Sequence, residues 1–132
     1  MSEYLGLPES MAIEAQIIGR MVRFGDRAHE IISRMSVEQF YSERHRVIFE
    51  AIAKIAETAA PSLQSIAAAL DRAKKLESIG GAAYLMEIVD SSFSMVGTDS
   101  DIDAVQGTYK RRQTIEMARA LLNDAVEAES AD

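Results

Sequence analysis

Apolar residues recur every three or four positions along most of this chain, which is the spacing of amphipathic α-helices. The most regular stretch covers residues 42–58, where Ile48, Ile52 and Ile55 fall on one face. Ser42 is the expected N-cap of this helix, because its hydroxyl can accept a backbone N–H of the first turn. We predict that this is the central helix and that the shorter helices pack against it.

The same spacing predicts two helices before the central one. The first is expected to begin at Ser10 and to end at Gly25 in a left-handed conformation. Asp26 is the predicted N-cap of the second helix. Ser36 and Gln39 have the spacing of a capping box, which predicts a short turn before the central helix.

Two further helices are predicted after the central one. Residues 62–70 again place their apolar side chains on one face. The glycine pair Gly80-Gly81 then predicts a break before a short helix over residues 82–89. Residues 90–100 have the composition of a loop.

A long last helix is predicted from Ser100, which has the spacing of a capping box with Asp103, to about residue 128. No stretch alternates apolar and polar residues as a strand would. The predicted fold class is therefore all-α: a compact domain of about six helices with a long carboxy-terminal helix. The predicted organisation is a flexible amino terminus over residues 1–9, a helical head domain over 10–98, the long helix over 99–128, and a tail over 129–132.

The length of 132 residues is typical of one domain, and a hydrophobic content of 48% is that of a globular chain. No cysteine is present, so disulfides and thiolate metal sites are excluded. The first residues lack a basic region followed by an apolar run, so no signal peptide is expected. No apolar window of about 18 residues predicts a membrane span. The expected location is the cytoplasm.

The net charge of −7 bears on the class of partner. Proteins that bind DNA tightly and without specificity use clustered lysine and arginine to neutralise phosphates. The one basic run, Lys110-Arg111-Arg112, is interpreted as a solvated helix face. Direct contact with nucleic acid is therefore not expected.

The chain carries no motif that predicts catalysis or a bound cofactor. A nucleotide-hydrolysing enzyme would need the phosphate-binding pattern Gly-x-x-x-x-Gly-Lys-Ser/Thr, which is absent. His29 is expected to be solvated, and His45 is expected to be half-buried and bonded to a backbone carbonyl or a carboxylate. The aspartates near residue 100 alternate like calcium ligands, but Ala104 interrupts that pattern, so no metal site is predicted.

Three motifs occur along the chain in a fixed order. They are Pro8-Glu9-Ser10-Met11 running to Ile17-Ile18-Gly19, then Phe40-Tyr41 with His45-Arg46 and Ile48-Phe49, then Leu76 followed by Gly80-Gly81 and Tyr84-Leu85. Together they resemble the amino-terminal domain of bacterial replicative DNA helicases, the DnaB family. The resemblance covers about residues 7 to 127.

The resemblance implies a non-catalytic domain that forms a collar on a hexameric helicase and binds primase. It also implies that the last helix is the first arm of a helical hairpin that dimerises, although the second arm falls outside this chain. The chain departs from the family pattern in several places. Residues 61–80 are about one residue shorter, the loop at 90–100 is about four longer, Ala12 stands where the family usually has glutamate, and Val105 stands where a tyrosine is expected.

Two histories fit this resemblance. The chain can be a domain of a larger helicase, or a complete small protein of a phage or mobile element that binds a host helicase, loader or primase. A small helical DNA-binding regulator is the alternative from another class, and the acidic charge argues against it. The expected partners are primase, a helicase loader or helicase subunits.

Two groups of residues are predicted to contact partners. Tyr84 belongs to the motif that the resemblance places in the partner-contact region, while Phe93 and Met95 are apolar residues in a predicted surface loop. The last helix carries an apolar stripe that we predict forms a weak homodimer or a higher oligomer. Its members are Ile115, Ala118, Leu121, Leu122 and Ala125.

Overall fold

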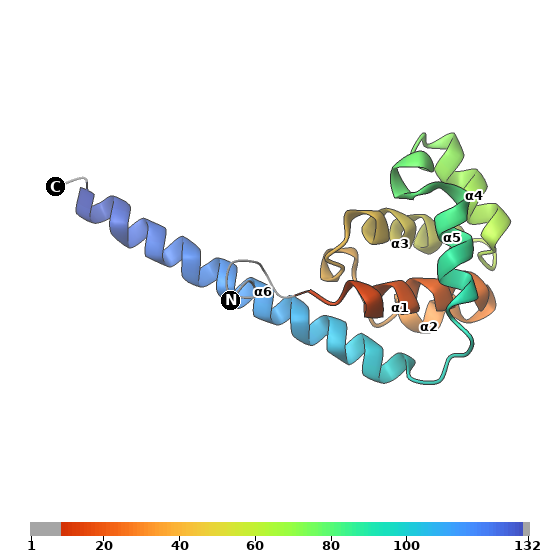
Figure 1. The fold of residues 1–132 in the computed structure, drawn as a ribbon, viewed down its shortest axis with the longest axis horizontal. Helices are drawn as coiled ribbons and strands as arrows, with labels where there is room; N and C mark the ends of the chain where they lie inside the picture. The colour runs from red at the N-terminus through yellow and green to blue at the C-terminus, as the bar shows by residue number, and fades with distance from the viewer. Residues whose placement is uncertain (1–8, 131–132) are drawn as a thin grey trace.

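The computed structural model describes residues 9–130, which form six α-helices and three short 3₁₀ helices without any strand (Figure 1). The all-α prediction is confirmed. The elements are α1 (Met11–Arg23), η2 (Gly25–Arg27), α2 (Ala28–Ile32), η3 (Val37–Gln39), α3 (Glu43–Ala56), α4 (Leu63–Arg72), η4 (Glu77–Ile79), α5 (Gly81–Asp90) and α6 (Thr98–Ser130). The predicted flexible segment 1–9 lies outside the described residues except for Glu9.

Helices α1 to α5 form a head, and α6 runs beneath α1 and continues well beyond it (Figure 1). The helix at the centre of the head is α1, which contacts α2, α3, α4, α5 and α6. The prediction that α3 is the central helix is therefore wrong. The reason is that α1 buries residues on nearly its whole circumference, from Ile17 to Val22 without a gap, whereas α3 buries one stripe.

The predicted core face of α3 is confirmed, because Ile48 and Ile52 are both fully buried. The crossing of α1 and α5 is close because it is made at Gly19. A Cβ atom at Gly19 would lie 2.2 Å from the Ser92 hydroxyl and 2.3 Å from the Ile88 carbonyl oxygen. No larger residue fits at this position without moving the two helices apart.

Gly25 has a different role from the predicted one. Helix α1 ends at the C-cap Phe24, and Gly25 does not have a positive φ. It begins η2 and packs against another segment, because a Cβ there would lie 1.7 Å from the carbonyl oxygen of Pro61. Asp26 lies inside η2 and is not a cap, since Arg27 holds the N-cap position of α2.

The helix-capping predictions are confirmed at some positions and not at others. Ser36 donates its backbone N–H to the Gln39 side chain over 3.1 Å, as the predicted capping box requires. Ser10 and Ser42 hold the expected N-cap positions, but neither makes a side-chain cap hydrogen bond. The glycine break is confirmed, with φ of 101° at Gly80 and 70° at Gly81.

Helix α6 begins two residues earlier than predicted. Its first residue is Thr98, preceded by Gly97 with a φ of 89°. The Ser100 hydroxyl donates to the Gly97 carbonyl over 3.1 Å, so Ser100 lies within the first turn and does not form a capping box with Asp103. The helix runs for 33 residues, to Ser130.

Candidate protein interaction sites

A buried polar cluster joins three helices of the head. The Glu14 carboxylate of α1 is fully buried, and it accepts the backbone N–H groups of Tyr41 and Ser42 over 2.6 and 3.2 Å. The same carboxylate accepts His45 Nδ1 of α3 over 2.9 Å. Glu14 therefore holds the segment that leads into α3, at the backbone N–H groups of Tyr41 and of the N-cap Ser42.

His45 has the carboxylate partner that was predicted, but it is buried and not half-buried. With its Nδ1 proton donated to Glu14, its Nε2 atom accepts the Tyr84 hydroxyl proton over 2.5 Å. The guanidinium of Arg44 lies 4.0 Å from the centre of the Tyr84 ring. Burial raises the pKa of the Tyr84 hydroxyl, against the opposing effect of the Arg44 charge.

The Tyr84 hydroxyl and one face of its ring thus make contacts within the head, and only part of the ring is exposed. This leaves less of the residue for a partner than its motif suggested. Its first role in the fold is to connect α5 with α3.

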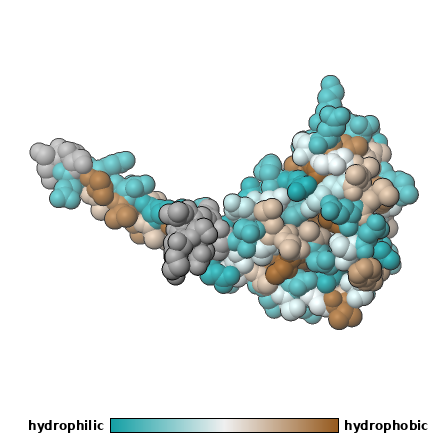
Figure 2. Space-filling view, in the orientation of Figure 1, coloured by the Kyte–Doolittle hydropathy of each residue, from teal (hydrophilic) through white to brown (hydrophobic). Residues whose placement is uncertain are grey.

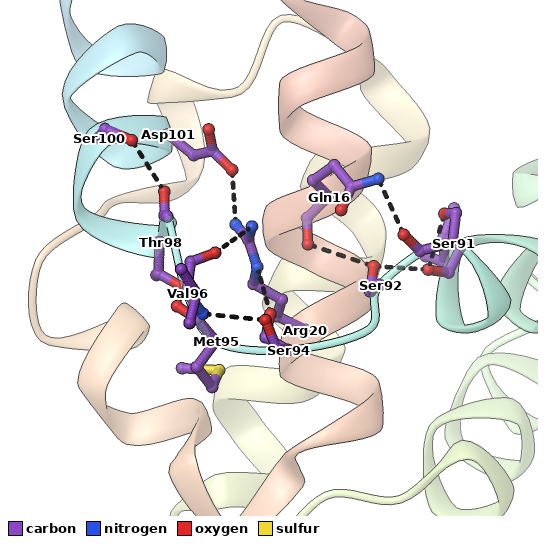
Figure 3. Close-up of polar contacts among 12 residues, drawn as sticks. Gln16, Arg20, Ser91, Ser92, Ser94, Met95, Val96, Thr98, Ser100 and Asp101 are labelled. Carbon is purple, nitrogen blue, oxygen red and sulfur yellow. Dashed lines mark hydrogen bonds and ion pairs between the residues drawn. The ribbon is translucent and has the colours of Figure 1, made fainter.

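Arg20 fixes the loop between α5 and α6. It is buried, and its guanidinium donates to the carbonyl oxygens of Ser94 and Val96, each over 3.0 Å. It also pairs with Asp101 in the first turn of α6 over 2.6 Å. Figure 3 shows Arg20 projecting from α1 into the concave side of this loop, with α6 beginning just beyond. One side chain therefore positions both the loop and the start of α6.

The loop held by Arg20 presents apolar side chains to solvent. Phe93 is 79% exposed, which agrees with its predicted surface position. Met95 differs from the prediction, because it is partly buried and packs against the core. Val96 was not predicted, yet it is 84% exposed. The exposed apolar pair of this loop is therefore Phe93 and Val96.

The inner half of α6, residues 98–112, is packed against the head. Ile102 and Val105 are buried, and Arg112 is also buried, with its Nη2 donating to the Gln39 carbonyl over 3.1 Å. Arg34 adds ion pairs to Asp99 and Asp103 on the outer side of this contact. The interpretation of the basic run as a solvated face is wrong for Arg112, because its guanidinium bonds a backbone carbonyl of the head.

The outer half of α6, residues 113–130, has the opposite character. Met117, Leu121 and Leu122 are 65%, 64% and 64% exposed. Figure 2 shows hydrophobic patches along this part of the helix, which projects away from the head. All five predicted stripe residues lie in this half, and Ile115 is the only one of them that is partly buried.

Glu14 and Arg20 were not singled out by the sequence, although a signal was present. Both residues lie in a stretch whose other side chains are mostly apolar, and Glu14 is three and four residues before Ile17 and Ile18. A charged residue on the apolar face of a helix is either paired inside the fold or placed at a site. Which partner satisfies it depends on contacts across more than 25 residues of sequence.

Nothing in the described part of the chain points to a metal or a membrane. No group of three or more carboxylate or imidazole side chains in residues 9–130 could hold a metal ion. None of the described helices is long and apolar enough to cross a membrane.

Fold and site together define an all-helical domain with a compact head, an apolar loop held by Arg20, and a projecting helix that exposes large apolar side chains. The chain belongs to the DnaB-like helicase N-terminal domain family, whose profile matches residues 6–107. The family that the three sequence motifs indicated is thereby confirmed, and it places the chain among DNA replication proteins.

The relatives are replicative helicases of diverse bacteria. Replicative DNA helicase DnaB of Synechocystis is 29% identical over 109 residues, which is 82% of this chain and 12% of that protein. DnaB of Mycobacterium leprae is 29% identical over 85 residues, which is 64% of this chain and 14% of that protein. The chain therefore corresponds to a small part of the length of these relatives.

A solved structure shares the fold. The N-terminal domain of DnaB helicase from Mycobacterium tuberculosis superimposes with a TM-score of 0.86, covering 92% of this chain and 85% of that one. The two sequences are 23% identical, so this likeness concerns the fold alone.

Proposed function

We propose that this chain is a non-catalytic association domain of DNA replication, which binds further copies of itself and one other replication protein. The exposed apolar stripe on the outer half of α6 is the observation that carries this proposal. It presents Leu121 and Leu122 to solvent on a helix that projects from the head. Burying such side chains gains roughly 25 cal/mol per Å² of apolar surface, which favours a partner.

Self-association is assigned to the stripe that the sequence predicted. Residues 115, 118, 122 and 125 lie three or four positions apart, so they fall on one side of the helix. Ala118 and Ala125 are small, which lets a second helix approach closely between the larger side chains. We expect a weak, concentration-dependent homodimer or a higher oligomer.

The second partner surface is the loop between α5 and α6. Phe93 and Val96 are exposed, and two hydrogen bonds from Arg20, to the carbonyl oxygens of Ser94 and Val96, already hold the backbone of this loop. A loop that is ordered before binding loses less conformational entropy when a partner docks. The expected occupant is primase, a helicase loader or a helicase subunit, with the exposed part of Tyr84 and the partly buried Met95 as lesser contributors.

The non-catalytic part of the proposal rests on the sequence and on the family. The chain has no phosphate-binding pattern, and the matching family is that of the helicase N-terminal domain. We therefore expect no ATP hydrolysis by the purified chain. Turnover that co-purifies with the protein and disappears on a point mutation within it would contradict this.

Analytical ultracentrifugation tests the association. We expect the wild type to sediment as a mixture of monomer and oligomer from micromolar to near-millimolar concentration, and Leu121→Glu to remain a monomer. Ala120→Glu is the matched control, because residue 120 lies on the opposite side of the helix from the stripe. A wild type that stays strictly monomeric over this range would sink the proposal, as would a Leu121→Glu variant that associates like the wild type.

A further inference from the structure

The buried polar cluster of the head is a chain of hydrogen-bonded groups from α1, α3 and α5. The Glu14 carboxylate of α1 meets His45 Nδ1 of α3 over 2.9 Å, and His45 Nε2 meets the Tyr84 hydroxyl of α5 over 2.5 Å. Glu14 and His45 are buried, whereas Tyr84 is partly exposed. The cluster therefore leads from the interior of the head to its surface.

The position of one proton in this cluster is fixed at the inner end. A carboxylate offers only acceptors, and Glu14 already accepts the backbone N–H groups of Tyr41 and Ser42. An unprotonated Nδ1 would point its lone pair at a carboxylate oxygen, so the proton of the neutral imidazole lies on Nδ1. The Nε2 atom then carries no proton and accepts the O–H of Tyr84.

A second proton on His45 changes the roles at the outer end of the cluster alone. The imidazolium donates from both ring nitrogens, so Nδ1 keeps its bond to Glu14. Nε2 becomes a donor, and the Tyr84 oxygen can accept because a hydroxyl both donates and accepts. The bond between His45 and Tyr84 is then reversed without being broken, and the hydroxyl proton turns away from His45.

The packing around Tyr84 holds the ring in place during this exchange. The Arg44 guanidinium lies 4.0 Å from the centre of the ring. Gly80 closes another side, because a Cβ atom there would lie 2.9 Å from Tyr84 Cβ and 3.4 Å from Arg44 Nη1. Burial raises the pKa of the Tyr84 hydroxyl, so this group stays protonated throughout. The direction of one O–H bond is therefore what changes with the protonation of His45.

Charged groups face this pair from three helices. The Glu14 carboxylate of α1 lies beside Nδ1, and the Arg44 guanidinium of α3 lies against the Tyr84 ring. Glu87 of α5 adds a negative charge near the Tyr84 hydroxyl. An imidazolium at this site would thus have a carboxylate beside it, which is the condition for carrying a charge in the interior of a protein.

We propose that His45 is a positioning residue that sets the direction of the Tyr84 hydroxyl proton, and that proton uptake by His45 reverses this direction. While His45 is neutral, the outward lone pairs of the Tyr84 oxygen accept, and they suit a lysine, an arginine or a backbone N–H. With His45 protonated, the outward O–H donates and suits a carbonyl or a carboxylate. This consequence for a partner rests on the proposed function, in which the exposed part of Tyr84 contributes to the contact.

Nuclear magnetic resonance of the whole chain tests the reversal. The ring nitrogens of both histidines and the Tyr84 ring carbon that bears the hydroxyl are followed from about pH 8 to about pH 5.5, a range in which histidine side chains ordinarily titrate. We expect neutral His45 to carry its proton on Nδ1, and the Tyr84 hydroxyl proton to show a nuclear Overhauser effect to His45. On acidification the Tyr84 carbon should shift with the midpoint of His45, and the hydroxyl resonance should be lost by exchange with water.

Matched variants separate this role from a purely structural one. His45→Gln keeps an acceptor near the Nε2 position but cannot gain a proton, so its Tyr84 signal should no longer depend on pH. His29→Gln is the control, because His29 is exposed and its replacement should leave the Tyr84 profile unchanged. Where His45→Gln does not fold by circular dichroism, Tyr84→Phe replaces it and should shift the titration of His45 but not that of His29.

Several outcomes would overturn the proposal. One is a neutral His45 with its proton on Nε2, and another is a Tyr84 signal that does not follow the His45 midpoint. A Tyr84 signal that still depends on pH in folded His45→Gln, or a Tyr84→Phe chain in which His45 titrates as in the wild type, would do the same. None of these measurements needs a second copy or a partner, so a chain that stays monomeric in sedimentation contradicts the proposed function and leaves this test intact.

Discussion

The head and the outer half of α6 break the ordinary rule of side-chain placement in opposite directions. The head buries charged residues, Glu14 and Arg20, while the outer helix exposes large apolar ones, Leu121 and Leu122. Each buried charge in this pair is satisfied inside the chain, by three donors at Glu14 and three acceptors at Arg20.

This difference separates the part of the molecule whose unusual side chains are paired within the chain from the part whose apolar side chains are left exposed. A buried charge whose partners lie in the same chain stabilises the fold, so replacing it should lower the free energy of unfolding. An exposed apolar stripe does not stabilise the fold of its own chain, so replacing its residues should weaken association instead. Four predictions, which involve five substitutions, can break or sharpen this distinction.

The largest expected effect is at Glu14. Glu14→Ala leaves His45 and the backbone N–H groups of Tyr41 and Ser42 without their acceptor. Each unsatisfied buried donor costs about 1–3 kcal/mol, so we expect a loss of about 3–5 kcal/mol in the free energy of unfolding. Urea denaturation measures it, with exposed Glu38→Ala as the control. A loss below about 1 kcal/mol would mean that the cluster does not support α3.

Substitutions of buried apolar residues in the head give a reference with which the effect at Glu14 can be compared. Ile48→Ala and Ile52→Ala each remove buried methyl groups and leave a cavity, which typically costs about 2–5 kcal/mol. The same denaturation experiment measures both. Changes below about 0.5 kcal/mol at the two positions would show that α3 does not contribute to the core.

A smaller effect is expected at Arg20, because the loop that it holds lies at the surface. Arg20→Ala should destabilise the head by about 1–3 kcal/mol and speed amide hydrogen exchange in residues 92–98. Arg23→Ala is the control on the same helix, since Arg23 is exposed and bonds a different carbonyl, that of Val89. Unchanged exchange in the loop would remove the argument that Phe93 is presented on an ordered backbone.

The smallest effect on stability is expected in the outer helix. Leu121→Glu should change the free energy of unfolding by no more than about 0.5 kcal/mol when measured at a concentration where the wild type is monomeric. The side chain is exposed in the single chain, so no core contact is lost. A loss of more than about 2 kcal/mol would mean that Leu121 lies in the core of its own chain, so that the outer helix would not differ from the head in this respect.

Much of the fold could be predicted because helical spacing reflects one buried face per helix. This worked for α3, where Ile48 and Ile52 are both in the core. It failed to identify α1 as the central helix, since charged residues interrupt its apolar pattern and their partners lie far along the sequence.

The glycines also show that the local sequence predicts only part of the fold. Gly80 was correctly predicted as a break because a positive φ favours glycine locally. Gly25 is required for another reason, its contact with the carbonyl of Pro61, and a contact across 36 positions leaves no local signal. The spacing alone also could not show that Ile102 is buried and Leu122 exposed, because both follow the same periodicity on one helix.

The straight course of α6 also sets a distance. Its outer half has 18 residues, which at about 1.5 Å of rise per residue measure about 27 Å. Any copy held by this segment is kept at a separation that is fixed by residue count. An insertion of seven residues would lengthen the spacer by about 10.5 Å and keep the stripe near its original direction, whereas an insertion of five would turn it away. In the proposed oligomer, the length of this helix therefore sets the separation between the heads.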